Sequence, residues 1–124
     1  MARVTPRLVE TAYFLLRMMT GLLFAEHGLQ KLVGLLGGTR VPLLSELGLA
    51  GAIELVAGLA VAFGVFPRWA ALLAAGEMAV AYFTAHAGRG FWPVQNHGEL
   101  AVLYCFVFLF IAARGGGELS LTRD

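Results

Sequence analysis

Four long apolar segments make up most of this chain, and they limit what it can fold into. A helix that crosses a bilayer needs about 20 mostly apolar residues, with a range of about 17 to 25. Segments close to this length cover residues 8–29, 47–65, 69–85 and 98–113. Only 14% of the 124 residues are charged, whereas soluble domains carry about 25%. The sequence predicts an all-α fold, a four-helix transmembrane bundle that forms a single integral membrane domain over residues 1–124.

Composition also argues against several other classes of protein. The net charge is +1, and the chain has no basic run and no zinc-finger spacing, so nucleic-acid binding has no support. The one cysteine, Cys105, can form neither an internal disulfide nor a CxxC redox pair. The first apolar segment is long, carries Arg17 and lacks a small-residue cleavage site, which favours a retained helix over a signal peptide.

Basic residues in the short loops predict the orientation, because they accumulate on the cytoplasmic side. The side that carries both termini has five arginines: Arg3, Arg7, Arg68, Arg114 and Arg123. The opposite side has three basic residues: Lys31, Arg40 and Arg89. We therefore expect a multi-pass protein with both termini in the cytoplasm.

Small residues recur four positions apart on the predicted helices. Gly58 and Ala62 are one such pair, and Ala71 and Ala75 are another. This spacing lets helix backbones approach closely in lipid, where van der Waals packing drives association. We interpret these positions as helix-packing faces.

Arg17 and Glu77 are charged residues placed deep in two apolar segments, where unpaired charge is costly. At 1.5 Å per residue, Arg17 lies roughly 14 Å and Glu77 roughly 12 Å from the same membrane face. Similar depth and opposite charge predict a buried structural ion pair between them. Such a pair would hold the helices in register or take part in proton- or electron-coupled chemistry.

A second group of ionisable residues gathers toward the opposite face of the membrane. It contains three carboxylates and three histidines: Glu26, His27, Glu54, His86, His97 and Glu99. These groups could bind a metal, relay protons or hydrogen-bond a quinone headgroup. The alternative is that some of them, His86 and His97 above all, lie in the wet headgroup region where charges cost little. The pattern does not identify a metal. The Glu-x-x-His repeats of a di-iron bundle are missing, and haem ligation by two histidines is supported by composition alone.

Several short motifs are similar to those of one family. Residues 24–32, FAEHGLQKL, resemble the HGxxKL signature of the DoxX family of small bacterial membrane proteins. YFTAH at 82–86 and GFWP at 90–93 resemble its YFxAH…GFWP segment. NHGE at 96–99 resembles its NGGE element, and residues 115–121 resemble its GGGxxSL tail.

Two positions depart from the family pattern. His97 stands where the pattern has Gly, and Thr122 stands where it has Asp. A site built around His97 would therefore not be general to the family.

The family is named for a membrane subunit linked to thiosulfate:quinone oxidoreductase and terminal quinol oxidase. The resemblance implies a four-helix protein of the bacterial inner membrane that is associated with quinone-linked redox chemistry. It does not imply that this chain handles thiosulfate.

The first hypothesis is a quinone-linked oxidoreductase subunit. Its catalytic, proton-exchanging residues would be Glu54, His86 and Glu99, and its cofactor-binding residues would be Glu26, His27 and His97. Electrons would come from a soluble or membrane oxidoreductase partner, because the chain has no recognisable redox motif of its own.

Two other hypotheses stay open. The chain could be a non-catalytic accessory or assembly subunit that docks onto a larger complex through its small-residue faces. It could also be a small transporter or proton channel, for which four short helices would need to form a homo-oligomer.

Overall fold

The computed structural model describes residues 3–124, and all the regular structure in that range is helical. The four long helices are α1 (Pro6–Val33), α2 (Glu46–Phe63), α3 (Pro67–Ala81) and α5 (Glu99–Arg114). α3 runs on into a π-helical turn, η1 (Tyr82–His86), and a 3-10 turn, η2 (Ala87–Arg89), and α4 (Pro93–Asn96) is a single turn. The predicted all-α fold is confirmed.

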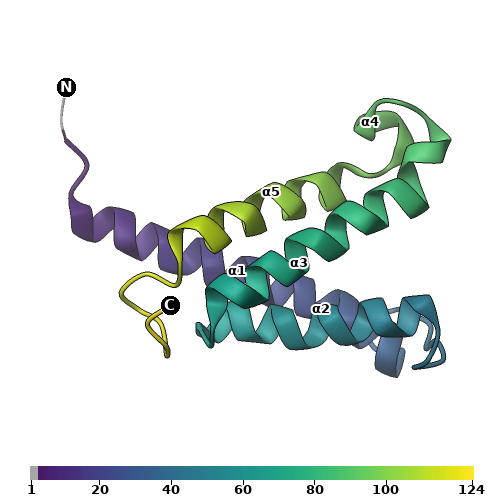
Figure 1. Cartoon of the computed structure of the whole chain (residues 1–124), viewed down its shortest axis with the longest axis horizontal. Helices are drawn as coiled ribbons and strands as arrows, with labels where there is room; N and C mark the ends of the chain where they lie inside the picture. The colour runs from purple at the N-terminus through teal and green to yellow at the C-terminus, as the bar shows by residue number, and fades with distance from the viewer. Residues whose placement is uncertain (1–2) are drawn as a thin grey trace.

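The long helices form two hairpins that pack on each other. α1 packs along α2, α3 packs along α5, and α2 joins the two hairpins through its contact with α3. Figure 1 shows that successive long helices run in opposite directions, so the first described residues and the C-terminus lie at the same end of the molecule. The connection between α1 and α2 lies at the other end, as does α4.

Three helical stretches are long and apolar enough to cross a membrane: Pro6–Val33, Glu46–Phe63 and Pro67–Arg89. Their outer surfaces carry many exposed large apolar side chains, such as Leu15, Val56 and Phe83. Apolar surface of this extent needs lipid rather than water around it. The chain is therefore a multi-pass membrane protein.

α1 is longer than the expected 8–29 at both ends. The Thr5 hydroxyl accepts a hydrogen bond from the Leu8 amide at 3.2 Å, and Pro6 occupies the first turn, where its missing N–H costs nothing. At the other end, the helix continues through the polar residues 30 and 31 and ends at Gly34, whose φ is 75°. The expected end at residue 29 was too early, because hydropathy falls at the first polar residues whereas the helical backbone hydrogen bonds continue past them.

Glycines set the separation of α1 and α2. A Cβ placed on Gly28 would lie 2.5 Å from the Leu55 amide nitrogen, and one on Gly58 would lie 2.7 Å from that of Ala25. Both distances are too short for real atoms, so only glycine allows the two backbones to approach this closely. The predicted packing role of Gly58 is confirmed by this contact.

Arg17 is 1% exposed, but it does not pair with Glu77 as the sequence predicted. Its Nε donates to the Val61 carbonyl at 3.0 Å, Nη2 donates to the Leu119 carbonyl at 2.9 Å, and Nη1 donates to the Gly116 carbonyl. The last carbonyls of a helix lack partners within the helix and form the negative end of its dipole, so they attract a buried cation. Arg17 therefore ties α1 to the end of α2 and to the C-terminal tail.

The tail, residues 115–124, folds back over the turn between α2 and α3. The Ser120 hydroxyl donates to the Gly64 carbonyl at 2.9 Å, and the Phe66 amide donates to the Thr122 hydroxyl at 2.9 Å. An aspartate at position 122 could accept the same bond, which explains why Thr122 is tolerated there. The GGGxxSL-like tail thus closes one end of the bundle.

Candidate functional site

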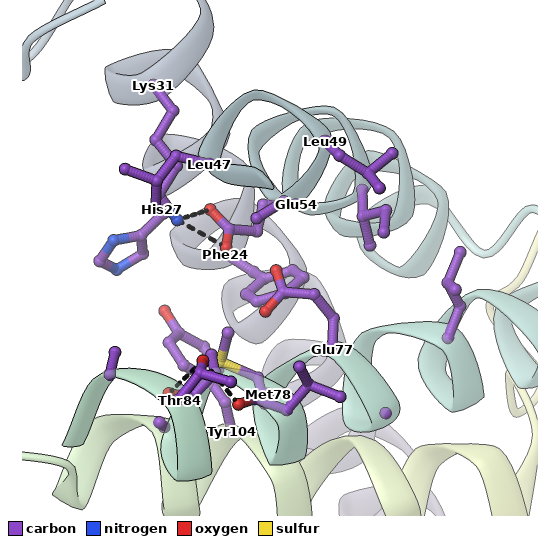
Figure 2. A pocket seen from close by; sticks show the side chains of 18 of the residues that line it. Phe24, His27, Lys31, Leu47, Leu49, Glu54, Glu77, Met78, Thr84 and Tyr104 are labelled. Atoms are coloured by element: carbon purple, nitrogen blue, oxygen red, sulfur yellow. Dashed lines mark hydrogen bonds and ion pairs between the residues drawn. The ribbon is translucent and has the colours of Figure 1, made fainter. Parts of the chain in front are cut away.

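A cavity of about 1080 Å³ opens between the two hairpins, and α1, α2, α3, η1 and α5 all contribute to its wall. Most of the wall is apolar and includes Trp69, Leu72 and Met78. Polar side chains occupy part of it, and Figure 2 shows several of them from close by. They are His27, Lys31, Glu46, Glu54, Glu77, Thr84, His86, His97 and Tyr104.

An ion pair between Lys31 and Glu54 forms the polar centre of this cavity. Lys31 Nζ lies 2.6 and 2.7 Å from the two carboxylate oxygens of Glu54, which is 1% exposed. The pair links α1 to α2 next to the close contact at Gly28. From the sequence, Lys31 was expected in the loop and was not recognised as a site residue. A carboxylate in an apolar helix demands a partner, and that requirement was the available signal.

Glu77 lies in the same cavity rather than beside Arg17. Its carboxyl group extends from α3 toward Glu54 and Phe24 (Figure 2). Both of its oxygens are buried and accept no hydrogen bond from any residue in 3–124. The structure therefore places two carboxyl groups and one ammonium at the centre of the cavity.

Aromatic and imidazole groups complete the polar part of the wall. The His27 ring meets the buried Tyr104 ring edge-on, with centroids 6.1 Å apart. His86 lies in the π turn η1, and its Nδ1 is 3.2 Å from the Asn96 carbonyl oxygen. π turns inside helices often occur at functional sites, and this one brings Thr84 and His86 to the cavity.

Asn96 organises the loop before α5, and the sequence analysis did not identify this role. It is fully buried, its Nδ2 donates to the Tyr82 hydroxyl at 2.9 Å and to the Gly90 carbonyl at 3.0 Å, and its Oδ1 accepts from the Gly98 amide at 2.8 Å. A buried side-chain amide with these partners fixes the loop that connects η2 to α5. The resemblance of residues 96–99 to the NGGE element was the available signal.

His97 has an exposed side chain at the rim of the cavity and a left-handed backbone, with φ at 62°. Glycine adopts this conformation without strain, whereas other L-residues pay about 1 kcal/mol or more. The glycine of the family pattern suits this left-handed backbone, and His97 departs from that pattern.

His97→Gly is therefore expected to stabilise the protein by about 1 kcal/mol, because it relieves the strained backbone. Thermal unfolding of the purified protein in a mild detergent measures this. A lower unfolding midpoint for His97→Gly would show that contacts of the His97 side chain stabilise the protein by more than the backbone strain destabilises it.

The structure does not bring Glu26 and Glu99 into the cavity. Glu26 is exposed, since it precedes His27 by one residue and so faces about 100° away from it on α1. Glu99 is exposed in the first turn of α5 and faces a separate surface depression formed with Pro93 and Leu103. Of the predicted site residues, Glu54, His27, His86 and His97 share the cavity.

The described residues offer no ready metal centre. Within residues 3–124, no three side chains of His, Cys, Asp or Glu lie close enough together to hold a metal ion. The mixed apolar and polar wall of the cavity suits an organic ligand with both polar and apolar parts.

Comparison with known proteins identifies the family. A family model described as DoxX matches residues 12–87. An uncharacterized protein of Haemophilus influenzae is 39% identical, over 88% of this chain and 88% of its own. A second uncharacterized protein of that organism is 32% identical, over 55% of this chain and 45% of its own. No solved structure matches this chain. The chain belongs to the DoxX family.

Proposed function

We propose that this protein is a subunit of the bacterial inner membrane that binds a quinone or quinol in the cavity between its two hairpins and serves quinone-linked redox chemistry. The observation that carries the proposal is the cavity itself, an apolar space with the half-buried ammonium of Lys31 and the buried carboxyl groups of Glu54 and Glu77 at its polar centre. Ligand sites typically combine an apolar wall with a few convergent polar groups in this way.

In this proposal α5 is the fourth membrane-crossing helix. Its 16 residues span about 24 Å, and it turns large apolar side chains outward, among them Leu103, Phe106 and Phe110. Four crossings agree with the two ends of the described chain lying at the same end of the molecule (Figure 1). The excess of arginine on that side favours a cytoplasmic location for both termini.

The residues of the cavity fit a quinone. A quinone oxygen accepts hydrogen bonds, which the Tyr104 hydroxyl and the His27 ring can donate, and a quinol hydroxyl donates to a carboxylate such as Glu77. An isoprenoid tail can lie against the apolar wall around Leu72 and Leu73. When bound, a quinone supplies reversible two-electron, two-proton redox chemistry.

This chain's residues would bind and orient the headgroup and exchange protons with it. The Lys31–Glu54 pair fixes the polar centre, and His86, near the end of the cavity, is suited to exchange protons with the aqueous side. An oxidoreductase partner would exchange the electrons.

The structure weakens the main argument for a purely accessory subunit. That hypothesis used the small-residue faces as docking surfaces. Gly58 contacts α1, and Ala71 and Ala75 are 0% and 2% exposed, so these faces already pack inside the protein.

The proposed function predicts that Glu54→Gln lowers quinone affinity at least about tenfold. The substitution removes the carboxylate that pairs with Lys31 at the polar centre, and the loss of such a charge-assisted hydrogen bond costs about 1.4 kcal/mol or more. Quinones quench tryptophan fluorescence, and Trp69 lines the cavity, so titrating the purified protein with decylubiquinone measures the affinity directly.

Glu99→Gln is the matched control, since Glu99 lies outside the cavity. A double variant, Glu54→Gln with Lys31→Met, removes both charges and guards against loss of the fold. Wild-type affinity in the folded Glu54 variants would contradict the proposed site.

A further inference from the structure

Within residues 3–124, Glu77 is the buried carboxyl group of the cavity that has no cation of its own. Both of its carboxyl oxygens are buried and accept no hydrogen bond within residues 3–124. The ammonium of Lys31 is engaged by both oxygens of Glu54, at 2.6 and 2.7 Å. Because an isolated ionised carboxylate in apolar surroundings is very costly, a cluster of two carboxyls and one ammonium is favoured when one carboxyl holds a proton. Glu77, which has no cation of its own and lies against the carboxyl group of Glu54, is that carboxyl.

Within residues 3–124, the elements around the cavity offer Glu77 no lysine or arginine other than Lys31. The remaining titratable side chains are His27 on α1, Glu46 and Glu54 on α2, His86 on η1, Tyr104 on α5 and His97 in the preceding loop. His86 is held at the Asn96 carbonyl oxygen and His97 has an exposed side chain at the rim, so neither is paired with Glu77.

We propose that Glu77 carries the exchangeable proton of the quinone site and makes quinone binding depend on pH. This inference rests on the proposed function. As a neutral acid, Glu77 has an O–H group that donates to a quinone oxygen, which can only accept. As a carboxylate, it accepts from a quinol hydroxyl. From the sequence, Glu77 was expected to pair with Arg17, either to hold the helices in register or to take part in proton- or electron-coupled chemistry; in this inference it carries a proton without that pair.

The chemical step is a proton equilibrium with water and needs no oxidant or reductant. When a quinone binds to protein in which Glu77 is ionised, Glu77 takes up one proton and the new O–H bond is the only covalent bond formed. When a quinol binds, either state of Glu77 can make a hydrogen bond, so less proton uptake accompanies binding.

The test is a titration of the purified full-length protein with decylubiquinone and with its quinol from pH 6 to pH 11, read by tryptophan fluorescence. The quinone Kd is expected to be constant at low pH and to rise tenfold per pH unit once Glu77 ionises. The quinol Kd should change less. In Glu77→Gln, whose amide donates at every pH, the quinone Kd should stay within about threefold of the low-pH wild-type value throughout.

Proton uptake provides a second readout that does not depend on the variant folding. A pH-indicator dye in weakly buffered detergent solution should report uptake approaching one proton per quinone bound at high pH by the wild type, and none by Glu77→Gln. Glu26→Gln, an exposed carboxylate on α1, should behave like the wild type.

The outcomes separate the inference from the proposed function. A wild type that binds quinone without proton uptake anywhere from pH 6 to pH 11 overturns the inference and leaves the quinone site standing. The same holds for a folded Glu77→Gln that keeps the pH dependence. A wild type that binds neither quinone nor quinol at any pH overturns the proposed function and the inference with it.

Discussion

Lys31→Met is expected to destabilise the protein by about 3–5 kcal/mol, because it leaves the carboxylate of Glu54 buried without its cation. Glu54 is 1% exposed, and the structure gives its two oxygens the ammonium of Lys31 as their partner. Unfolding of the purified protein, by heat or by increasing fractions of a denaturing detergent, measures the loss.

A second substitution distinguishes a lost pair from a lost packing contact. Adding Glu54→Gln to Lys31→Met removes the unpaired charge and should restore most of the lost stability. Arg40→Gln, which removes an exposed cation, should change stability by less than about 0.5 kcal/mol. Equal losses in the single and the double variant would show that the ion pair is not what matters at this position.

Gly28→Ala is expected to have the second large effect, a loss of about 3 kcal/mol, because the added methyl group would have to occupy space held by backbone atoms. The new Cβ would lie 2.5 Å from the Leu55 amide nitrogen and 2.6 Å from the Gly51 carbonyl oxygen. Backbone atoms of a packed helix cannot move aside as a side chain can. The same forced separation of α1 and α2 should lengthen the Lys31–Glu54 pair and weaken quinone binding.

Gly76→Ala is the matched control, because a Cβ at Gly76 would have nothing within 4 Å. It adds the same methyl group to a helix in the same membrane and should be neutral or stabilising by up to about 1 kcal/mol. Thermal unfolding of the two variants side by side makes the comparison. Similar losses in both would mean that alanine is poorly tolerated in these helices for a reason other than close backbone contact.

The family motifs acquire physical roles in this structure. In the HGxxKL-like segment, Gly28 permits the close contact with α2 and Lys31 pairs with Glu54. In the NGGE-like element, Asn96 binds the loop together and position 97 requires a left-handed backbone. In the tail, the Gly116 carbonyl accepts from Arg17.

The sequence predicted the helical class and the approximate helix positions, because runs of apolar residues in a chain with few charges allow little else. It also predicted that Glu54, His27, His86 and His97 would converge, since helices that alternate in direction bring these positions to one level of the bundle. It was harder to predict which way each side chain faces on its helix and which group it contacts. Glu26 and Glu99 lie at suitable depths but face away from the cavity.

The partner of Arg17 could not be predicted from side-chain charges alone. Its partners are backbone carbonyls at the end of α2 and in the folded tail, and they leave no trace in the pattern of charged residues. The predicted ion pair gave Glu77 a cation that it does not have. For that reason the sequence did not indicate that Glu77 and Glu54 bring two carboxyl groups into one cavity.

Mapping where a quinone binds tests most directly whether the cavity between the two hairpins is a quinone site. The purified protein would be photolabelled with an azido-quinone, with and without excess decylubiquinone, and the labelled residues identified by mass spectrometry. If a quinone binds between the two hairpins, competed labels are expected on the cavity wall, at residues such as Leu47, Ala50 and Ile53 of α2 and Leu73 and Val80 of α3. Labels spread over lipid-facing residues such as Phe106 and Phe110, unchanged by the competitor, would contradict quinone binding in the cavity.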